Sequence, residues 1–187
     1  RRLVAATLSG RLDPLSGRAQ VAGHPLPSEA AAVRSLVALA DIGGSQRSET
    51  SVTVGELLVE RLEMTLPWFR AFRARRSAAV WLGRVNAVLP AGSTAVRLDS
   101  TLVSLPQLER AVALATVALA ERTPVVMLDQ LDPFANPEDE AAFVAALSSI
   151  APATTTLVLG TPVPARATDA PSSRPRLEAR AAPPREC

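Results

Sequence analysis

The segment from residue 104 to residue 129 constrains the fold more than any other part of the sequence. Apolar residues recur there at the three- and four-residue steps of a helix with one apolar face: Leu105, Leu108, Val112, Ala115 and Leu119. Pro124 ends this pattern, and four apolar residues then predict a buried strand that leads into Asp129. A helix packed against a buried strand favours an α/β fold, with a mainly parallel sheet flanked by helices.

Other local signals extend this prediction along the chain. The apolar run at 33–40 predicts a second strand that is covered on both faces, and 154–160 predicts a third. Thr53 with Glu56, and Ser104 with Gln107, have the three-residue spacing of capping boxes that begin helices. The sequence therefore predicts alternating strands and helices.

Composition limits the class of protein. With 187 residues and 48% hydrophobic content, the chain suits one domain with a sizeable core and a tail, and residues 163–187 are expected to be disordered. The net charge of only +2 does not mark a strongly basic protein, so it gives little support to general nucleic-acid binding. The lone Cys187 excludes an internal disulfide and fits a reducing cytosol, and no apolar run is long enough to span a bilayer.

Charge is unevenly distributed along the sequence. No acidic residue lies between Glu63 and Asp99, a region that holds six arginines and four aromatic residues: Arg70, Arg73, Arg75, Arg76, Arg84, Arg97, Trp68, Phe69, Phe72 and Trp81. From 123 to 165 there is no arginine, and acidic residues supply the charge. The two regions should therefore differ in electrostatic potential.

Several motifs, in this order and spacing, resemble the ATP-binding cassette (ABC) ATPases, the nucleotide-binding subunits of ABC transporters. Val103-Ser104-Leu105-Pro106-Gln107 resembles the Leu-Ser-Gly-Gly-Gln signature, and 125–129 resembles the Walker B strand. Leu131-Asp132-Pro133 is similar to a shortened D-loop, and 8–27 and 51–62 resemble other parts of the same domain. The resemblance covers about residues 1–162.

This resemblance implies a P-loop NTPase type of α/β fold with a small helical subdomain at about 64–100. It implies ATP and Mg²⁺ as ligands, with Ser104 and Gln107 binding nucleotide and Asp129 holding the metal. It also implies a homo- or heterodimer of nucleotide-binding domains, peripheral at the cytoplasmic face of the membrane and docked on a membrane-embedded permease subunit. The arginine and aromatic region would provide that docking surface, and no nucleic-acid partner is expected.

Departures from the family pattern put hydrolysis in doubt. The chain has no lysine, so the Walker A loop is absent; we expect the sequence to be truncated just after it, ahead of Arg1. Gln130 stands where the catalytic glutamate is usual, and an amide cannot accept a proton from water near neutral pH. Leu105-Pro106 replaces two signature glycines, Thr161-Pro162 replaces the switch histidine, and Asp41 stands where a Q-loop glutamine is usual. No catalytic residue is therefore assigned, and ATP hydrolysis is expected to be slow or absent.

Two alternatives remain open. The chain would be a non-enzymatic structural or regulatory subunit with a degenerate ABC fold if it does not bind Mg²⁺-ATP. It would be a membrane-surface or nucleic-acid-binding module if the arginine cluster gives steeply salt-dependent binding to either target.

Overall fold

The computed structural model describes residues 2–41, 52–131, 134, 136–151 and 154–160. Two predicted features, the tail at 163–187 and Thr161-Pro162, lie outside these residues, as do Asp132 and Pro133 of the D-loop-like segment. The elements follow one another in the order α1 (Arg2–Leu8), β1 (Ala19–Val21), β2 (His24–Leu26), α2 (Ala30–Leu36), β3 (Val37–Asp41), α3 (Val54–Thr65), η1 (Trp68–Arg73), α4 (Ala74–Val88), η2 (Leu102–Ser104), α5 (Gln107–Leu119), β4 (Val125–Leu131), α6 (Pro137–Ile150) and β5 (Thr155–Gly160).

The central sheet in the described part of the chain has the strand order β3-β4-β5, and both pairs of neighbours are parallel. A separate antiparallel hairpin joins β1 to β2 through Ala22 and Gly23, both of which have positive φ. The α/β prediction is therefore confirmed, with parallel pairing in the three-stranded sheet. Among the described residues, no helix combines the length and apolar character needed to cross a bilayer.

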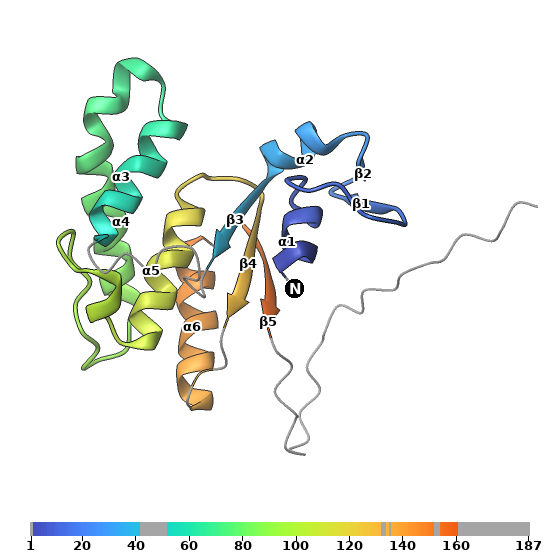
Figure 1. Ribbon diagram of the computed structural model, residues 1–187. Coiled ribbons are helices and arrows are strands. Elements are labelled where there is room, and N and C mark those ends of the chain that lie inside the picture. Colours follow the sequence, from blue (N-terminus) through green and yellow to red (C-terminus); the bar gives the residue numbers. More distant parts are fainter. Residues whose placement is uncertain (1, 42–51, 132–133, 135, 152–153, 161–187) are drawn as a thin grey trace, which may run out of the picture.

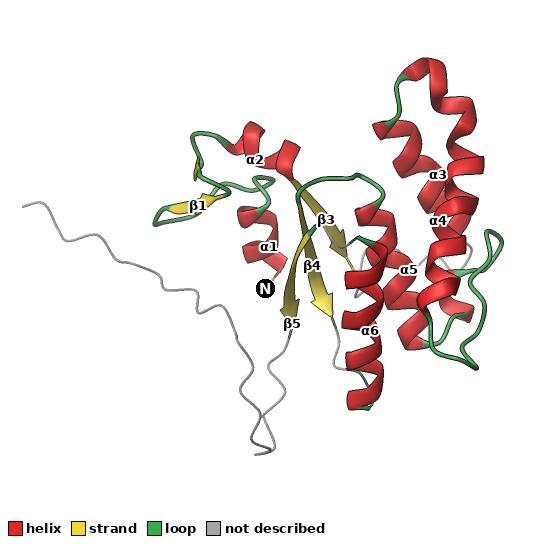
Figure 2. Ribbon diagram, turned by 180° about the vertical axis from the view of Figure 1, so that it is seen from behind, coloured by secondary structure: helices red, strands yellow, loops and turns green. Residues whose placement is uncertain are grey.

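The central strand β4 separates two apolar layers. Val126 and Leu128 belong to a core cluster that includes the buried side chains of α5, α4 and α6. Met127 belongs to a second cluster with Ala5 of α1 and Val33 of α2. Because successive strand residues point to opposite faces, the sheet is covered on both sides, as Figures 1 and 2 show.

The strand predicted at 33–40 is only half correct. Its first half belongs to α2, and β3 begins at Val37. The three alanines at 30–32 favour a helix, and Val33 is fully buried in the cluster that contains Ala5. Arg34 also donates a hydrogen bond to the Gly10 carbonyl, at 2.7 Å, which ties α2 to the turn after α1. Helix propensity and tertiary packing together override the local apolar run.

The predicted capping box at Thr53 and Glu56 is confirmed. The Glu56 amide donates to Thr53 Oγ1 at 3.2 Å, and Glu56 Oε2 accepts from the Thr53 amide at 2.8 Å and from its hydroxyl at 2.9 Å. The bonds from the Thr53 backbone and then its hydroxyl lower the pKa of the Glu56 carboxyl.

The first turn of α3 also lies against the chain that precedes η2. The Gly55 amide donates to the Leu98 carbonyl at 3.0 Å, and a Cβ at Gly55 would lie 2.5 Å from that oxygen. Only glycine permits this close approach of two backbone segments.

We expect Gly55→Ala to lower the free energy of unfolding by about 1–3 kcal/mol, because the new methyl group forces the two segments apart. Gly83→Ala is the matched control, since a Cβ at this helical glycine meets nothing within 4 Å. It should raise the free energy of unfolding by about 0.5–1 kcal/mol through helix propensity. Urea denaturation of both variants measures the difference, and equal effects would contradict the close approach at Gly55.

The capping box also predicts a pH dependence. A carboxyl whose folded pKa is lowered adds stability above its unfolded pKa, and this contribution disappears as the pH falls through the folded value. The stability gap between the wild type and Glu56→Gln should therefore be largest at neutral pH and shrink as the pH falls below about 4.3, the ordinary pKa of glutamate. Thermal unfolding across this range measures the gap, and a constant gap would show that the charge of Glu56 has no part in the cap.

Candidate functional site

The candidate site lies at one end of the α5–β4 unit. Residues 120–124 reverse the chain between these two elements, so α5 runs back along the strand that follows it (Figure 1). Its 13 residues extend about 20 Å, and the seven of β4 extend about 23 Å. The first residues of α5 therefore lie toward the carboxyl ends of the parallel strands, the end at which open α/β sheets place their ligands.

The hydroxyl of Thr123, in the connection between α5 and β4, bonds to both neighbouring strands. Thr123 Oγ1 accepts from the Ala38 amide at 3.2 Å and donates to the Val125 carbonyl at 2.9 Å. This side chain joins the starts of β3 and β4, and so helps to align the two strands. In the resulting register, Asp41 near the end of β3 is paired with Asp129 near the end of β4.

Asp129 is the metal-binding residue expected from the sequence, and the structure places it near the end of β4. Its Cα is paired with that of Asp41 on β3, and Leu159 on β5 is its partner on the other side. Two carboxylate residues thus occupy one level of adjacent parallel strands. Carboxylate oxygen is the ligand chemistry that Mg²⁺ prefers, so this pair of residue types fits the metal that the resemblance implies.

The partnership of Asp41 with Asp129 was missed by sequence reasoning. Each aspartate follows an apolar strand segment, which is a signal available in the sequence. Their common level depends on the register of two strands that lie more than eighty residues apart, which a one-dimensional pattern does not report. Among the described residues, no group of three or more His, Cys, Asp and Glu residues gathers into a metal site.

The capping box predicted for Ser104 and Gln107 is wrong. Ser104 is the last residue of η2, and its hydroxyl donates to the Thr101 carbonyl at 2.8 Å. Helix α5 begins at Gln107, and its N-cap residue, Pro106, makes no side-chain cap hydrogen bond. Pro106 itself occupies the N-cap position, so Ser104 lies two residues before it and cannot be the cap. Ser104 remains exposed and Gln107 half-buried, and their nucleotide-binding role stays a prediction.

Two side chains that sequence reasoning missed hold the segment that leads to Ser104. Asn86 of α4 donates to the Val96 carbonyl at 2.9 Å and accepts from its amide at 2.8 Å. Glu109 of α5 is only 5% exposed, and its Oε1 accepts from the Thr94 amide at 2.8 Å. The chain before η2 is therefore fastened to two helices by side chains.

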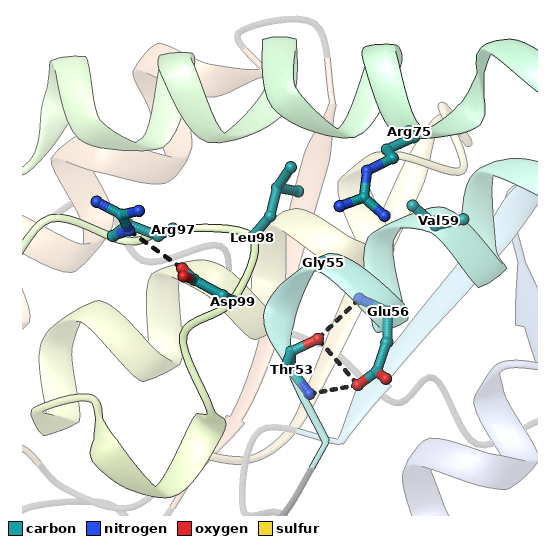
Figure 3. A pocket seen from close by; sticks show the side chains of 8 residues that line it. All are labelled: Thr53, Gly55, Glu56, Val59, Arg75, Arg97, Leu98 and Asp99. Carbon is teal, nitrogen blue, oxygen red and sulfur yellow. Dashed lines mark hydrogen bonds and ion pairs between the residues drawn. The ribbon is translucent and has the colours of Figure 1, made fainter.

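A hollow of about 620 Å³ opens between α3, α4 and this segment (Figure 3). Arg97 donates to Asp99 at 3.1 Å, which lowers the pKa of the Asp99 carboxyl, and Glu56 is occupied by its capping box. Arg75 extends from α4 toward α3 and has no hydrogen-bond or ion-pair partner among the described residues. The lining residues are Thr53, Gly55, Glu56, Val59, Arg75, Arg97, Leu98 and Asp99.

The predicted arginine and aromatic region does not form one surface. Trp81 is buried in the core, and Arg84 lies over its ring with its guanidinium carbon 5.0 Å from the ring centroid. Arg75 lines the hollow, whereas Arg73 and Arg76 border a different depression. Phe69 and Phe72 are exposed. The region therefore contains a structural tryptophan and two separate groups of arginines.

Comparison with known proteins adds the fold family. The sequence matches no protein-family model, and no curated protein matches it by sequence. Solved structures do match. CbiO1 from Clostridium perfringens, which is part of the ABC transporter complex CbiONQ, has a TM-score of 0.57 at 17% identity over 84% of this chain and 61% of its own.

Two structures of the bacterial ABC transporter cassette MJ0796 are also similar. The dimeric post-hydrolysis state bound to ADP and Pi has a TM-score of 0.55 at 13% identity, over 84% of this chain and 68% of its own. A second dimeric structure of the cassette has a TM-score of 0.54 at 13% identity, over 83% and 67%. The chain thus spans between three fifths and about two thirds of the length of these cassettes, and it has the α/β fold of an ABC ATP-binding domain.

Proposed function

We propose that the protein acts as the ATP-binding subunit of an ABC-type membrane transporter, binding ATP with Mg²⁺ and hydrolysing it slowly or not at all. The observation that carries this proposal is the α5–β4 unit, which places a signature-like segment and Asp129 toward one end of a parallel sheet. The likeness to ABC cassettes supports the same assignment at the level of the fold.

The chain supplies only part of a nucleotide site. Asp129 would hold Mg²⁺, with Asp41 at the same level as a second source of carboxylate oxygen. The metal, when bound, would neutralise phosphate charge. None of the 187 residues is a lysine, so the phosphate-binding lysine of a Walker A loop is not part of this sequence. The nucleotide experiments below therefore use the protein together with any residues that precede Arg1 in its gene.

The partners in this proposal are a second nucleotide-binding domain and a membrane-embedded subunit. The MJ0796 cassette is dimeric in both structures, and CbiO1 is part of a transporter complex. Ser104 is exposed before α5, where a second cassette would have access to it. The hollow beside Arg75 would receive a polypeptide segment of the membrane subunit, because it combines apolar walls at Val59 and Leu98 with charges of both signs. The protein would then lie at the cytoplasmic face of the membrane.

Slow or absent hydrolysis is proposed from the residues around the site. Gln130 can orient a water molecule but cannot take its proton. Pro106 has no amide hydrogen to donate at the entrance of α5, and it stands where the family signature has a glycine. The same observations favour the second candidate, a structural or regulatory subunit without nucleotide turnover. Calorimetric titration with Mg²⁺-ATP separates the two, since only the ATP-binding subunit should give saturable binding.

We expect Asp129→Ala to weaken Mg²⁺-dependent ATP binding at least about tenfold, because a carboxylate that would hold the metal is lost. Asp13→Ala removes one carboxylate from the exposed turn after α1 and is the matched control. Titrations with ATP in the presence and absence of Mg²⁺ measure the effect. Equal affinities for the wild type and Asp129→Ala would place the metal elsewhere.

Gln130→Glu should raise the rate of ATP turnover, because it restores a group that can accept a proton from water. The gain should be smaller than the factor of about 10² to 10⁴ that a general base usually provides, because Pro106 remains. A phosphate-release assay at saturating Mg²⁺-ATP measures the rate. Fast hydrolysis by the wild type that Gln130→Glu leaves unchanged or slows would mean that another residue activates the water.

A further inference from the structure

The outward surface of η1 and α4 carries two rows of side chains. In a 3₁₀ helix, residues three apart lie above one another, so Phe69 and Phe72 form one row and Arg70 and Arg73 form another. Along α4, the steps of three and four residues that separate Arg73, Arg76, Val80 and Arg84 place these residues on one exposed side. We call this exposed surface the arginine face. It consists of Phe69, Arg70, Phe72, Arg73, Arg76, Ser77, Val80 and Arg84.

The opposite side of α4 is already occupied. Ala74, Ala78, Trp81, Leu82 and Val85 are buried in the core cluster that contains the inner side chains of α3, α5 and α6. Figures 1 and 2 show α3 and α4 on the side of α5 that is remote from the sheet. The arginine face therefore points away from the core.

The cations of this face lack counterions in the described part of the chain. No acidic residue occurs between Glu63 and Asp99, and none of the described ion pairs involves Arg70, Arg73 or Arg76. Their positive charge is thus available to an external anion. Arg73 and Arg76, with Ser77 and Val80, also border an open depression of about 350 Å³, where two guanidinium groups and a hydroxyl would offer hydrogen bonds to one phosphate.

Exposed phenyl rings accompany these cations. The Phe72 side chain is 77% exposed and that of Phe69 is 53% exposed. The guanidinium carbon of Arg73 lies 5.3 Å from the Phe72 ring centroid, and that of Arg70 lies 5.5 Å from the Phe69 centroid. Each pair combines an apolar ring with a cation. Such a pair suits the boundary between lipid headgroups and acyl chains, where the ring is buried and the guanidinium contacts phosphate.

We infer that the arginine face binds the surface of an anionic phospholipid bilayer. Four arginines interspersed with small or apolar residues and flanked by two exposed rings match the charge and polarity of that surface. A single-stranded nucleic acid would need a groove that follows its backbone, whereas the described hollow on this face is a small open depression. The inference is independent of nucleotide binding and assigns this face a partner of its own, apart from the membrane subunit that the hollow beside Arg75 would receive.

Flotation with phosphatidylcholine vesicles, with and without phosphatidylserine, tests the inference on the full protein. The wild type should bind vesicles that contain phosphatidylserine, release them as salt rises, and bind pure phosphatidylcholine weakly. The combined change of Arg70, Arg73 and Arg76 to Gln should lower partitioning roughly 10²-fold, at about fivefold for each arginine. All three side chains are exposed, so the fold should be kept, and circular dichroism verifies it.

The matched control changes Arg18 and Arg122 to Gln and is compared with the double change of Arg73 and Arg76 to Gln. Arg18 and Arg122 are also exposed but lie outside the arginine face, and their substitution removes the same amount of positive charge as the change within the face. This variant should retain most of the binding. Equal losses in these two double variants would indicate general attraction of a positively charged protein and would overturn the inference. No binding by the wild type, or equal binding to neutral vesicles, would overturn it too.

The aromatic contribution is tested separately. Phe72→Ser should lower partitioning roughly tenfold, including at high salt, because ring burial does not depend on charge. Leu15→Ser is the control, since Leu15 is fully exposed and lies outside the face. The same variants titrated with a single-stranded oligonucleotide complete the test. An oligonucleotide that binds more tightly than the vesicles and loses affinity with the same substitutions would identify a nucleic-acid site instead.

Discussion

The structure depends on the burial of β4 between two apolar layers. Val126 and Leu128 contact the cluster built around α5, and Met127 contacts the cluster of α1 and α2. Both faces of this strand are covered, as is usual in a parallel sheet, and β3 and β5 pair with it in parallel. Asp129 lies near the carboxyl end of this strand, so the packing that fixes the strand also fixes the position of this residue. Fold and candidate site therefore share one cause.

Helix signals and strand signals differed in how well they could be interpreted from the sequence. The box at Thr53 and Glu56 and the apolar face of α5 are local patterns, and both are present in the structure. The run at 33–40 was misassigned because apolar residues alone do not distinguish a buried helical turn from a strand. At Ser104, spacing alone predicted a serine cap, but the helix begins two residues later than that cap requires, with Pro106 at the N-cap.

The sequence predicted individual residues of the candidate site but not how they are arranged relative to one another. Asp129 could be placed because the strand before it is a strong pattern, whereas its pairing level with Asp41 required the register of β3 and β4. Asn86 and Glu109 gave no motif, because each binds the backbone of a loop whose path only the tertiary structure defines. Side chains that hold irregular chain segments are commonly missed for this reason, since their partners are main-chain atoms without a residue signature.

The bonds made by Asn86 and Glu109 have a mechanical consequence. Asn86 of α4 forms hydrogen bonds with both the amide and the carbonyl of Val96, and Glu109 of α5 accepts one from the amide of Thr94. Both helices are therefore bonded to the same short segment of chain. Glu109 is buried, and a rigid shift of α4 away from α5 would leave its carboxylate without this donor. Because such a shift is costly, we expect α4, the loop at 94–96 and the start of α5 to move together as one rigid unit. A displacement of α4 would then also move the chain before η2 and the first turn of α5.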